Sequence, residues 1–353
     1  MAKISVGVLG ATGTVGQRFI QLLADHPWFE VTAVAASGRS AGQPYAEACH
    51  WLLPSTIPAE VADLTVQPIE PPLDCQLVFS ALPSSVAEPV EKEFARAGYA
   101  VCTNAAPHRM SKDVPLLIPE VNADHTRLIE SQRKQRGWKG LITASANCSG
   151  TQLALALKPL HEAFGLRKVS VVTMQAISGA GYPGIPASDI LENVVPYIGN
   201  EEDKVETEPL KMLGRVGGDR ITEASFIIGA QCNRVPVRDG HTECISFATE
   251  QEPSVEEVID ALEGFRAPAE IAGLPSSPEL PIVVRREPDR PQPVRDRNAG
   301  RGMSVVVGRV RPCPILGYKL VLLGHNTVRG AAGGAIHNAE LLAAQGWLGS
   351  VGS

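Results

Sequence analysis

The chain has 353 residues, of which 44% are hydrophobic and 20% charged, a composition typical of globular proteins and unlike that of disordered or collagen-like chains. Its 32 basic and 38 acidic side chains give a net charge of −6, which argues against a nucleic-acid partner. The length predicts two domains of ordinary size.

Neither a membrane span nor a metal site is expected from the sequence. The longest uncharged stretch, residues 169–188, contains three glycines and two prolines, which favours a strand and a loop over a spanning helix. The seven cysteines are scattered, and no two are separated by only two residues, so we expect neither a zinc site nor a disulfide framework. Together with an N-terminus that lacks a secretory pattern, this predicts a cytoplasmic protein.

The first half of the chain alternates short apolar runs with helical patterns. Strands are predicted at residues 4–9, 31–36, 77–80, 100–102 and 141–143, with helices at 15–24 and 85–97 among them. This alternation predicts a Rossmann-type, doubly wound α/β domain with a mostly parallel sheet.

The second half has longer strands, richer in β-branched residues. A helix is predicted at 150–164, and strands at 169–175, 224–230, 242–248, 304–310 and 319–323. A capping box at Ser254 and Glu257 opens a helix to about residue 265, the Arg- and Pro-rich segment 284–302 is expected to be an ordered loop, and residues 329–347 are expected to be helical. This half is predicted to be an α+β domain with a mixed sheet. We expect residues 1–147, completed by a C-terminal helix at 328–353, to form one domain, and residues 148–327 the other.

A glycine-rich turn, residues 10–16, lies between the first predicted strand and the first predicted helix. Glycines allow a sharp turn and close approach to a pyrophosphate, whose charge the helix N-terminus favours. This context favours a dinucleotide site over an unliganded turn.

NAD sites normally have an acid at the end of the second strand, but this chain has Ser37, Gly38, Arg39 and Ser40 there. A cation and two hydroxyls suit a 2′-phosphate, so we predict NADP; the alternative is that Arg39 is an ordinary surface residue.

Cys148 ends the last strand of the first half and begins a helix. A helix N-terminus stabilises a thiolate, so we expect a lowered pKa and a nucleophilic role for Cys148. The alternative, a buried structural cysteine, fits Cys75, Cys102 and Cys244 better.

Arg234 and His241 lie seven residues apart around a predicted turn. His241 is placed to take the thiol proton, and Arg234 to bind a carboxylate through two hydrogen bonds. Each residue, considered alone, also has an ordinary structural explanation.

Over nearly its whole length the chain resembles the aspartate-semialdehyde dehydrogenases, in the branch typical of archaea and fungi. The resemblance rests on an ordered series of motifs at residues 10–16, 36–42, 79–84, 104–109, 147–149, 174–184, 208–211, 232–241 and 324–333. One departure is Ala146, where the family more often has a proline.

The resemblance implies a role for each matching position. Cys148 is the nucleophile, His241 the acid/base and Gln175 the residue that orients the bound intermediate. Substrate binding falls to polar residues that contact the α-carboxylate, the α-amino group or the phosphate: Arg234, Glu208, Lys211, Arg109 and Asn104. Combined with the glycine-rich turn and the end of the second strand, the expected cofactor contacts are Gly10, Ala11, Thr12, Gly13, Thr14, Val15, Ser37, Gly38, Arg39, Ser40, Ser80, Ser178, Gly179 and Asn326.

The implied activity is the NADPH-dependent reductive dephosphorylation of L-4-aspartyl phosphate to L-aspartate 4-semialdehyde, a step of lysine, threonine and methionine biosynthesis. It proceeds through a thioester on the cysteine, releases inorganic phosphate, and implies a homodimer or homotetramer whose second domain carries catalysis and dimerisation. One alternative is an NADPH-dependent malonyl-CoA reductase of the same fold, but Glu208 and Lys211 suit an amino-acid phosphate better. A catalytically silent NADP-binding redox sensor is a further alternative, but such a protein would be expected to have lost Cys148 or His241.

Overall fold

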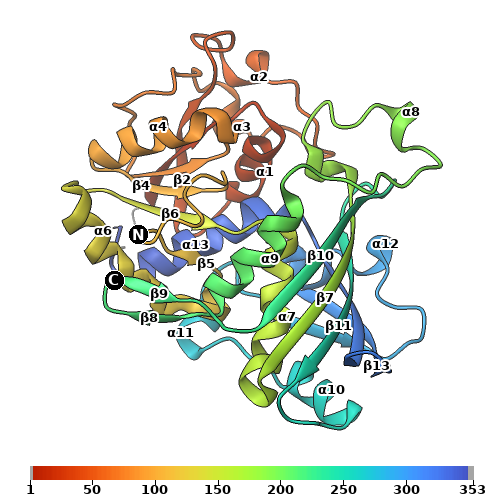
Figure 1. Ribbon diagram of the computed structural model, residues 1–353. Coiled ribbons are helices and arrows are strands. Elements are labelled where there is room, and N and C mark those ends of the chain that lie inside the picture. Colours follow the sequence, from red (N-terminus) through yellow and green to blue (C-terminus); the bar gives the residue numbers. More distant parts are fainter. Residues whose placement is uncertain (1–2, 349–353) are drawn as a thin grey trace.

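Two six-stranded sheets organise the computed structural model, which describes residues 3–348 (Figure 1). The first sheet has the strand order β2–β1–β3–β4–β6–β5, and all its paired strands run parallel. Its strands are β1 (Ile4–Leu9), β2 (Phe29–Ala35), β3 (Leu77–Ser80), β4 (Ala100–Thr103), β5 (Leu116–Leu117) and β6 (Leu141–Ser145). The order reverses between β1 and β3, which is where doubly wound sheets bind ligands. The predicted Rossmann-type domain is confirmed.

Helices cover both faces of the first sheet, which explains its continuous apolar strands. Phe79 of β3 packs with α1 (Thr14–Leu23) and α13 (Gly333–Ala344) on one face. Its neighbour Val78 faces the opposite way, toward α4 (Ser84–Arg96) and α7 (Cys148–Phe164). Smaller helices of this half are α2 (Tyr45–Ala48), α3 (Ala59–Ala62), α5 (Pro119–Asn122), the 3-10 turn Ala123–Arg127 and α6 (Leu128–Arg136).

The second sheet has the order β10–β7–β11–β14–β13–β12, with both parallel and antiparallel neighbours, as predicted. Its strands are β7 (Leu166–Gln175), β10 (Ile227–Arg234), β11 (His241–Thr249), β12 (Ile282–Arg285), β13 (Val305–Cys313) and β14 (Gly317–Gly324). One face packs on α7 and α10 (Val255–Glu263), and α7 thereby lies between the two sheets. On the other face Ser170 and Val172 of β7 are exposed, between the buried Val169, Val171 and Thr173.

The remaining elements surround this framework. They are α8 (Ala187–Ile190), α9 (Glu201–Met212), α11 (Ala269–Ala272), α12 (Pro293–Asp296), the 3-10 turns Ile177–Ala180 and Ala299–Gly302, and the hairpin of β8 (Arg215–Gly217) and β9 (Arg220–Thr222). In the described part of the chain no helix is long and apolar enough to cross a membrane.

Several predicted element boundaries are corrected by the structure. The strand expected at 224–230 runs from Ile227 to Arg234, so Arg234 ends a strand. The expected loop 284–302 contains α12 and the last residues of β12, and it is organised around the buried Asp296, which forms ion pairs with Arg285 and Arg290. The capping box is confirmed, because Ser254 Oγ accepts from the backbone N–H of Glu257 and the Glu257 carboxylate accepts from that of Ser254.

The last helix returns to the first sheet, where α13 contacts β4 and β6 (Figure 1). The helix expected at 329–347 is not continuous, because a wide turn at Val328–Ala332 precedes α13 and Ala331 leaves helical geometry there (φ −150°, ψ −109°). Of the C-terminal helix expected at 328–353, residues 349–353 lie outside the described part.

Candidate active site

A cavity of about 860 Å³ lies where the carboxyl ends of the first sheet meet the second sheet. One wall comes from the turn after β1, the loop after β3 and the loop after β4, and the other from α7, the ends of β7 and β10, and the start of α9. Twelve of the residues predicted from the sequence line it: Thr12, Gly13, Thr14, Val15, Asn104, Arg109, Cys148, Gln175, Ser178, Gly179, Arg234 and Asn326.

Cys148 and His241 lie in contact, with 3.1 Å between the sulfur and Nε2 of the imidazole. Cys148 is the first residue of α7, and His241 is the first residue of β11, a strand held between β7 and β14. The other ring nitrogen of His241, Nδ1, accepts the backbone N–H of Ala176 at 3.0 Å. The starts of α7 and β11 therefore fix the positions of Cys148 and His241, and the Ala176 N–H fixes the orientation of the imidazole.

Burial controls the protonation of this pair. It raises the pKa of the Cys148 thiol to about 12, Glu201 adds to the effect, and Arg109 and Arg234 oppose it. The expected lowering of the pKa by the helix N-terminus is therefore wrong, because loss of solvation outweighs it. Burial, the Arg234 cation and His325 lower the pKa of His241 to about 3, so both partners are neutral at pH 7.

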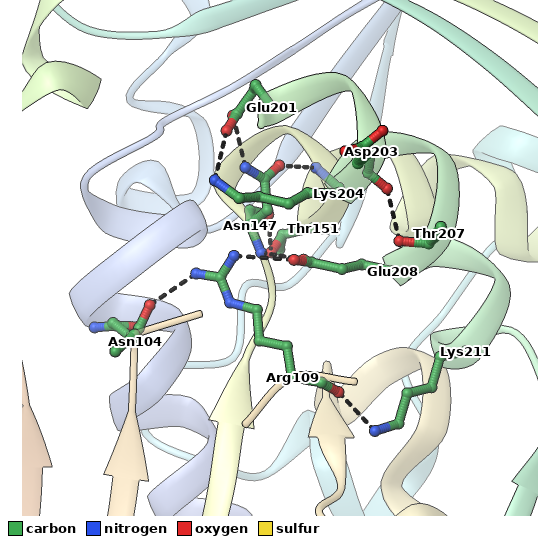
Figure 2. Close-up of polar contacts among 12 residues, drawn as sticks. Asn104, Arg109, Asn147, Thr151, Glu201, Asp203, Lys204, Thr207, Glu208 and Lys211 are labelled. Carbon is green, nitrogen blue, oxygen red and sulfur yellow. Dashed lines mark hydrogen bonds and ion pairs between the residues drawn. The ribbon is translucent and has the colours of Figure 1, made fainter. Parts of the chain in front are cut away.

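Glu201, the first residue of α9, is a site residue that sequence reasoning missed. Its Oε1 accepts from Asn147 Nδ2 at 2.6 Å and from Gln175 Nε2 at 3.1 Å (Figure 2 shows the Asn147 contact). Through these bonds it fixes the residue that precedes Cys148 and the amide of Gln175. An acid in the first turn of a helix is common for reasons of helix stability, so nothing in the sequence distinguished it.

Arg109 and Glu208 form a nearly buried ion pair, with 3.0 Å between Nη1 and Oε1 (Figure 2). Arg109 also donates to the Asn104 carbonyl at 2.7 Å. The second oxygen of Glu208 accepts the backbone N–H of Asn147 at 2.6 Å. Glu208 thus joins the loop after β4 to the turn that presents Cys148.

Lys211 lies behind the cavity wall, and its ammonium points at backbone carbonyls. Nζ donates to the carbonyl oxygens of Arg109, Ser111 and Val114 at 2.6, 2.8 and 2.9 Å. Burial lowers its pKa to about 8. In this state the cation of Lys211 holds the loop that carries Arg109.

Arg234 reaches the cavity from the end of β10, where its Nη1 donates to the Ala176 carbonyl at 2.7 Å. Gly179 makes this approach possible, since a Cβ there would lie 2.8 Å from Arg234 Nη1 and 3.2 Å from His241 Nε2. Ser178 accepts from Asn326 Nδ2 at 2.8 Å, so the two predicted cofactor contacts from distant segments are neighbours.

The turn after β1 is built to receive an anion. Gly10 has a φ of +77°, and a Cβ on it would lie 2.9 Å from the Ala81 carbonyl, so glycine is required there. Gly13, the N-cap of α1, provides no side-chain cap, and no acidic residue lies in the first turn. The N-terminus of α1 therefore presents N–H groups to the cavity, which fits a dinucleotide phosphate.

The other predicted cofactor residues lie at or beyond the edge of this cavity. Ala11 and Ser80 are fully buried, beneath the turn and at the end of β3. Ser37, Gly38 and Arg39 are exposed after β2, and Ser40 is half-buried.

Among the other cysteines, Cys102 is buried as expected, but Cys75 is half-buried and Cys244 is exposed on β11, which corrects the expectation for these two. Within residues 3–348 no group of three or more His, Cys, Asp or Glu is placed to hold a metal ion.

Comparison with known proteins agrees with this architecture. Residues 5–129 match the family model of the semialdehyde dehydrogenase NAD binding domain, and residues 157–329 match that of the semialdehyde dehydrogenase dimerisation domain. The two domains are thus those of a semialdehyde dehydrogenase.

Relatives narrow the class further. The chain is 53% identical to an aspartate-semialdehyde dehydrogenase of Archaeoglobus fulgidus, over 96% of this chain and 98% of the relative. It is 47% identical to that of Candida albicans, over 98% and 99% of the two chains. The crystal structure of the Candida albicans enzyme with NADP superposes with a TM-score of 0.89 at 44% identity, covering 98% of this chain and 99% of that one. The chain belongs to the aspartate-semialdehyde dehydrogenase family.

Proposed function

We propose that the chain catalyses the NADPH-dependent reductive dephosphorylation of L-4-aspartyl phosphate to L-aspartate 4-semialdehyde, a step of amino-acid biosynthesis. One observation carries the proposal: the Cys148 sulfur, 3.1 Å from His241, lines the same cavity as the uncapped N-terminus of α1. A nucleophile and a dinucleotide site in one cavity suit acyl transfer followed by reduction.

Cys148 is proposed to attack the acyl carbon of the substrate, so that phosphate leaves and a thioester forms on the sulfur. NADPH, when bound, supplies the hydride that reduces the thioester carbonyl. Gln175, whose amide is held by Glu201, is proposed to orient the acyl group. The position of Cys148 at the start of α7 also leaves its sulfur accessible from the cavity.

Charge complementarity supports the proposed substrate contacts. Arg234 is proposed to bind the α-carboxylate and Glu208 to lie near the α-amino group. Arg109, with Lys211 behind it, supplies positive charge for the phosphate. The ion pair of Arg109 with Glu208 supports neighbouring contacts for these groups, because it holds the buried Glu208 carboxylate against Arg109, which lines the cavity.

NADP is proposed to lie across the carboxyl end of the first sheet. The turn from Gly10 to Val15 suits its pyrophosphate, the segment from Ser37 to Ser40 its 2′-phosphate, and Ser178, Gly179 and Asn326 the nicotinamide end. The exposed position of Arg39 leaves its guanidinium available to such a phosphate.

A homodimer or homotetramer, assembled through the second sheet, is also proposed. The alternation of exposed and buried residues along β7 supports it, since this face of the sheet has no covering layer among residues 3–348. Inorganic phosphate as a product and a cytoplasmic location stay predictions.

The proposal is tested by measuring NADPH oxidation with L-4-aspartyl phosphate and with malonyl-CoA, and repeating both assays with NADH. We expect turnover with aspartyl phosphate and a preference for NADPH. Cys148→Ser should abolish turnover, whereas Cys75→Ser, half-buried beside Gly7 of β1 and away from both the cavity and the second sheet, should preserve it in a matched assay. Turnover of malonyl-CoA alone would overturn the proposal. The relatives are named aspartate-semialdehyde dehydrogenases, which supports aspartyl phosphate over malonyl-CoA.

A further inference from the structure

We propose that the buried ion pair of Arg329 with Glu120 positions the nucleophile: it fixes the wide turn at Val328–Ala332 so that the backbone of Gly330 forms the wall beside Cys148. Arg329 is a positioning residue, because its guanidinium lies behind that wall and acts through the backbone of the turn. The effect on turnover rests on the proposed function, whereas the effect on the thiol can be measured without substrate.

The wide turn lies directly against the nucleophile. A Cβ on Gly330 would lie 2.7 Å from the Cβ of Cys148, 2.9 Å from its Cα and 3.3 Å from its carbonyl oxygen. Non-bonded carbon atoms normally lie about 3.5–4.0 Å apart, so the two backbones pack with no room for a side chain between them. Gly330 and Ala331 also line the cavity. A shift of the turn would therefore change the space beside the sulfur.

The segment that leads into the wide turn also contacts the strand that carries His241. Asn326 Oδ1 accepts the backbone N–H of Gly240, the residue before His241, at 2.9 Å. The N–H of Gly330 donates to the carbonyl of His325 at 3.1 Å, which joins the turn to the residue before Asn326. One short segment therefore contacts the starts of both α7 and β11.

The ion pair holds this turn from outside the cavity. Ala331 leaves helical geometry within the turn, so its backbone is irregular there. Arg329 Nη1 and Nη2 donate to the two carboxylate oxygens of Glu120 at 2.8 and 2.6 Å. Two parallel bonds of this kind fix direction as well as distance. Glu120 belongs to α5, which contacts α7 and α13, so the turn is anchored to the helix that carries Cys148.

Both charges of the pair are withdrawn from water. The side chains of Arg329 and Glu120 are 2% and 0% exposed, and His337 Nδ1 lies 3.6 Å from Glu120 Oε2. Burial disfavours the carboxylate, but the Arg329 cation and His337 outweigh it and lower the pKa of Glu120 to about 2. Because desolvation is costly, a buried ion pair adds little net stability compared with apolar side chains of similar volume. A role in fixing geometry therefore explains the pair better than net stability does.

An apolar replacement separates positioning from stability. Glu120→Leu combined with Arg329→Met removes both charges at similar volume, so the midpoint of thermal unfolding should not fall. The apolar pair lacks directional bonds, and small displacements of reacting groups are costly, so kcat with L-4-aspartyl phosphate should fall roughly 10- to 100-fold while KM for it changes less than about threefold. Unchanged kcat in this folded variant would overturn the inference.

A second variant keeps the charges. Arg329→Lys can still pair with Glu120, but an ammonium cannot reproduce the two parallel bonds of a guanidinium. We expect its kcat to lie between that of the unsubstituted protein and that of the apolar variant. Full activity in Arg329→Lys would show that the two-point bond is not needed and would contradict the inference.

The contact between Gly330 and Cys148 gives a test that needs no substrate. Gly330→Ala places a methyl group against Cys148, so alkylation of this thiol by iodoacetamide, located by peptide mass spectrometry, should slow at least roughly tenfold. With Glu120→Leu and Arg329→Met also present, the turn can yield, and Gly330→Ala should slow alkylation by less than about threefold. The same slowing in both backgrounds would mean that the pair does not hold the turn against the nucleophile.

The matched control is Glu340→Gln, at a buried carboxylate on α13. Glu340 Oε1 lies 2.9 Å from His26 Nε2, and Oε2 accepts the backbone N–H of Ser276 at 3.0 Å, away from the cavity. This substitution should leave kcat and the effect of Gly330→Ala unchanged. A loss of kcat equal to that of the apolar variant would overturn the inference. Alkylation uses neither aspartyl phosphate nor NADPH, so a failure of the proposed function would be seen separately in the turnover assay.

Discussion

Arg109 and Glu208 form an ion pair across the cavity wall, with 3.0 Å between Nη1 and Oε1 and little of either side chain exposed. Arg109 belongs to the loop after β4, and Glu208 to α9. Because the second oxygen of Glu208 accepts the Asn147 N–H, one carboxylate aligns a proposed phosphate contact with the turn that presents the nucleophile.

Glu208→Gln should therefore damage both stability and turnover. The amide leaves the Arg109 cation without its counter-charge in a buried place, and breaking such a pair costs about 3 kcal/mol. We expect the free energy of unfolding, measured in urea, to fall by that amount and kcat/KM to fall roughly 100-fold.

The matched control lies on the same helix. Asp203 is exposed, and Asp203→Asn should change the unfolding free energy by less than about 0.5 kcal/mol. Equal effects of the two substitutions would mean that the buried pair has no special role.

Glu201 exerts two separable effects on the site. Its charge is one of the causes that raise the Cys148 pKa, and its Oε1 holds Asn147 and Gln175. Glu201→Gln removes the charge but retains an oxygen that can accept both bonds, so Cys148 should be alkylated roughly three- to tenfold faster at fixed pH. Glu201→Ala should also lower kcat further than Glu201→Gln, because Gln175 loses its support. Unchanged alkylation in Glu201→Gln would exclude the charge effect.

The sequence predicts local features of this protein well. The parallel sheet follows from apolar strands that alternate with helices, and the capping box at Ser254 is defined by residues three positions apart. Neighbouring residues in the chain likewise indicate the turn at Gly10, the place of Cys148 at a helix start, and the pair Arg234 and His241 around a turn. The structure brings this turn and these side chains to one site.

The features of the site that the sequence does not predict depend on contacts between distant segments. The Cys148 pKa is set by burial and by residues from other elements, which outweigh the helix N-terminus that the sequence reveals. Lys211 is bound by carbonyls about 100 positions earlier in the chain, so its orientation could not be predicted from local spacing. Glu201 has an ordinary position in a helix and acquires its contacts only on folding.

Glu243 should make stability depend on pH. Burial raises its pKa from 4.5 to about 8, and Gln152 Nε2 donates to one of its oxygens. Between these pH values the native state binds a proton that the unfolded chain has lost, so stability falls as pH rises. Glu243→Gln resembles the protonated acid and should remove this dependence, giving a relative gain at pH 8 over pH 5 of at most about 4 kcal/mol in urea unfolding. An unchanged pH slope would show that Glu243 is ionised in the native protein.

Arg39 should decide the choice of cofactor. Its side chain is exposed after β2, where an NAD site would have an acid, and no other basic residue lies among residues 36–42. Arg39→Ala removes the charge-assisted hydrogen bonds proposed for the 2′-phosphate, so KM for NADPH should rise roughly 10- to 100-fold while KM for NADH stays unchanged. Arg96→Ala, an exposed arginine at the end of α4, is the control that should affect neither value. If both cofactors lost affinity equally in Arg39→Ala, the residue would support the loop and would not bind the 2′-phosphate.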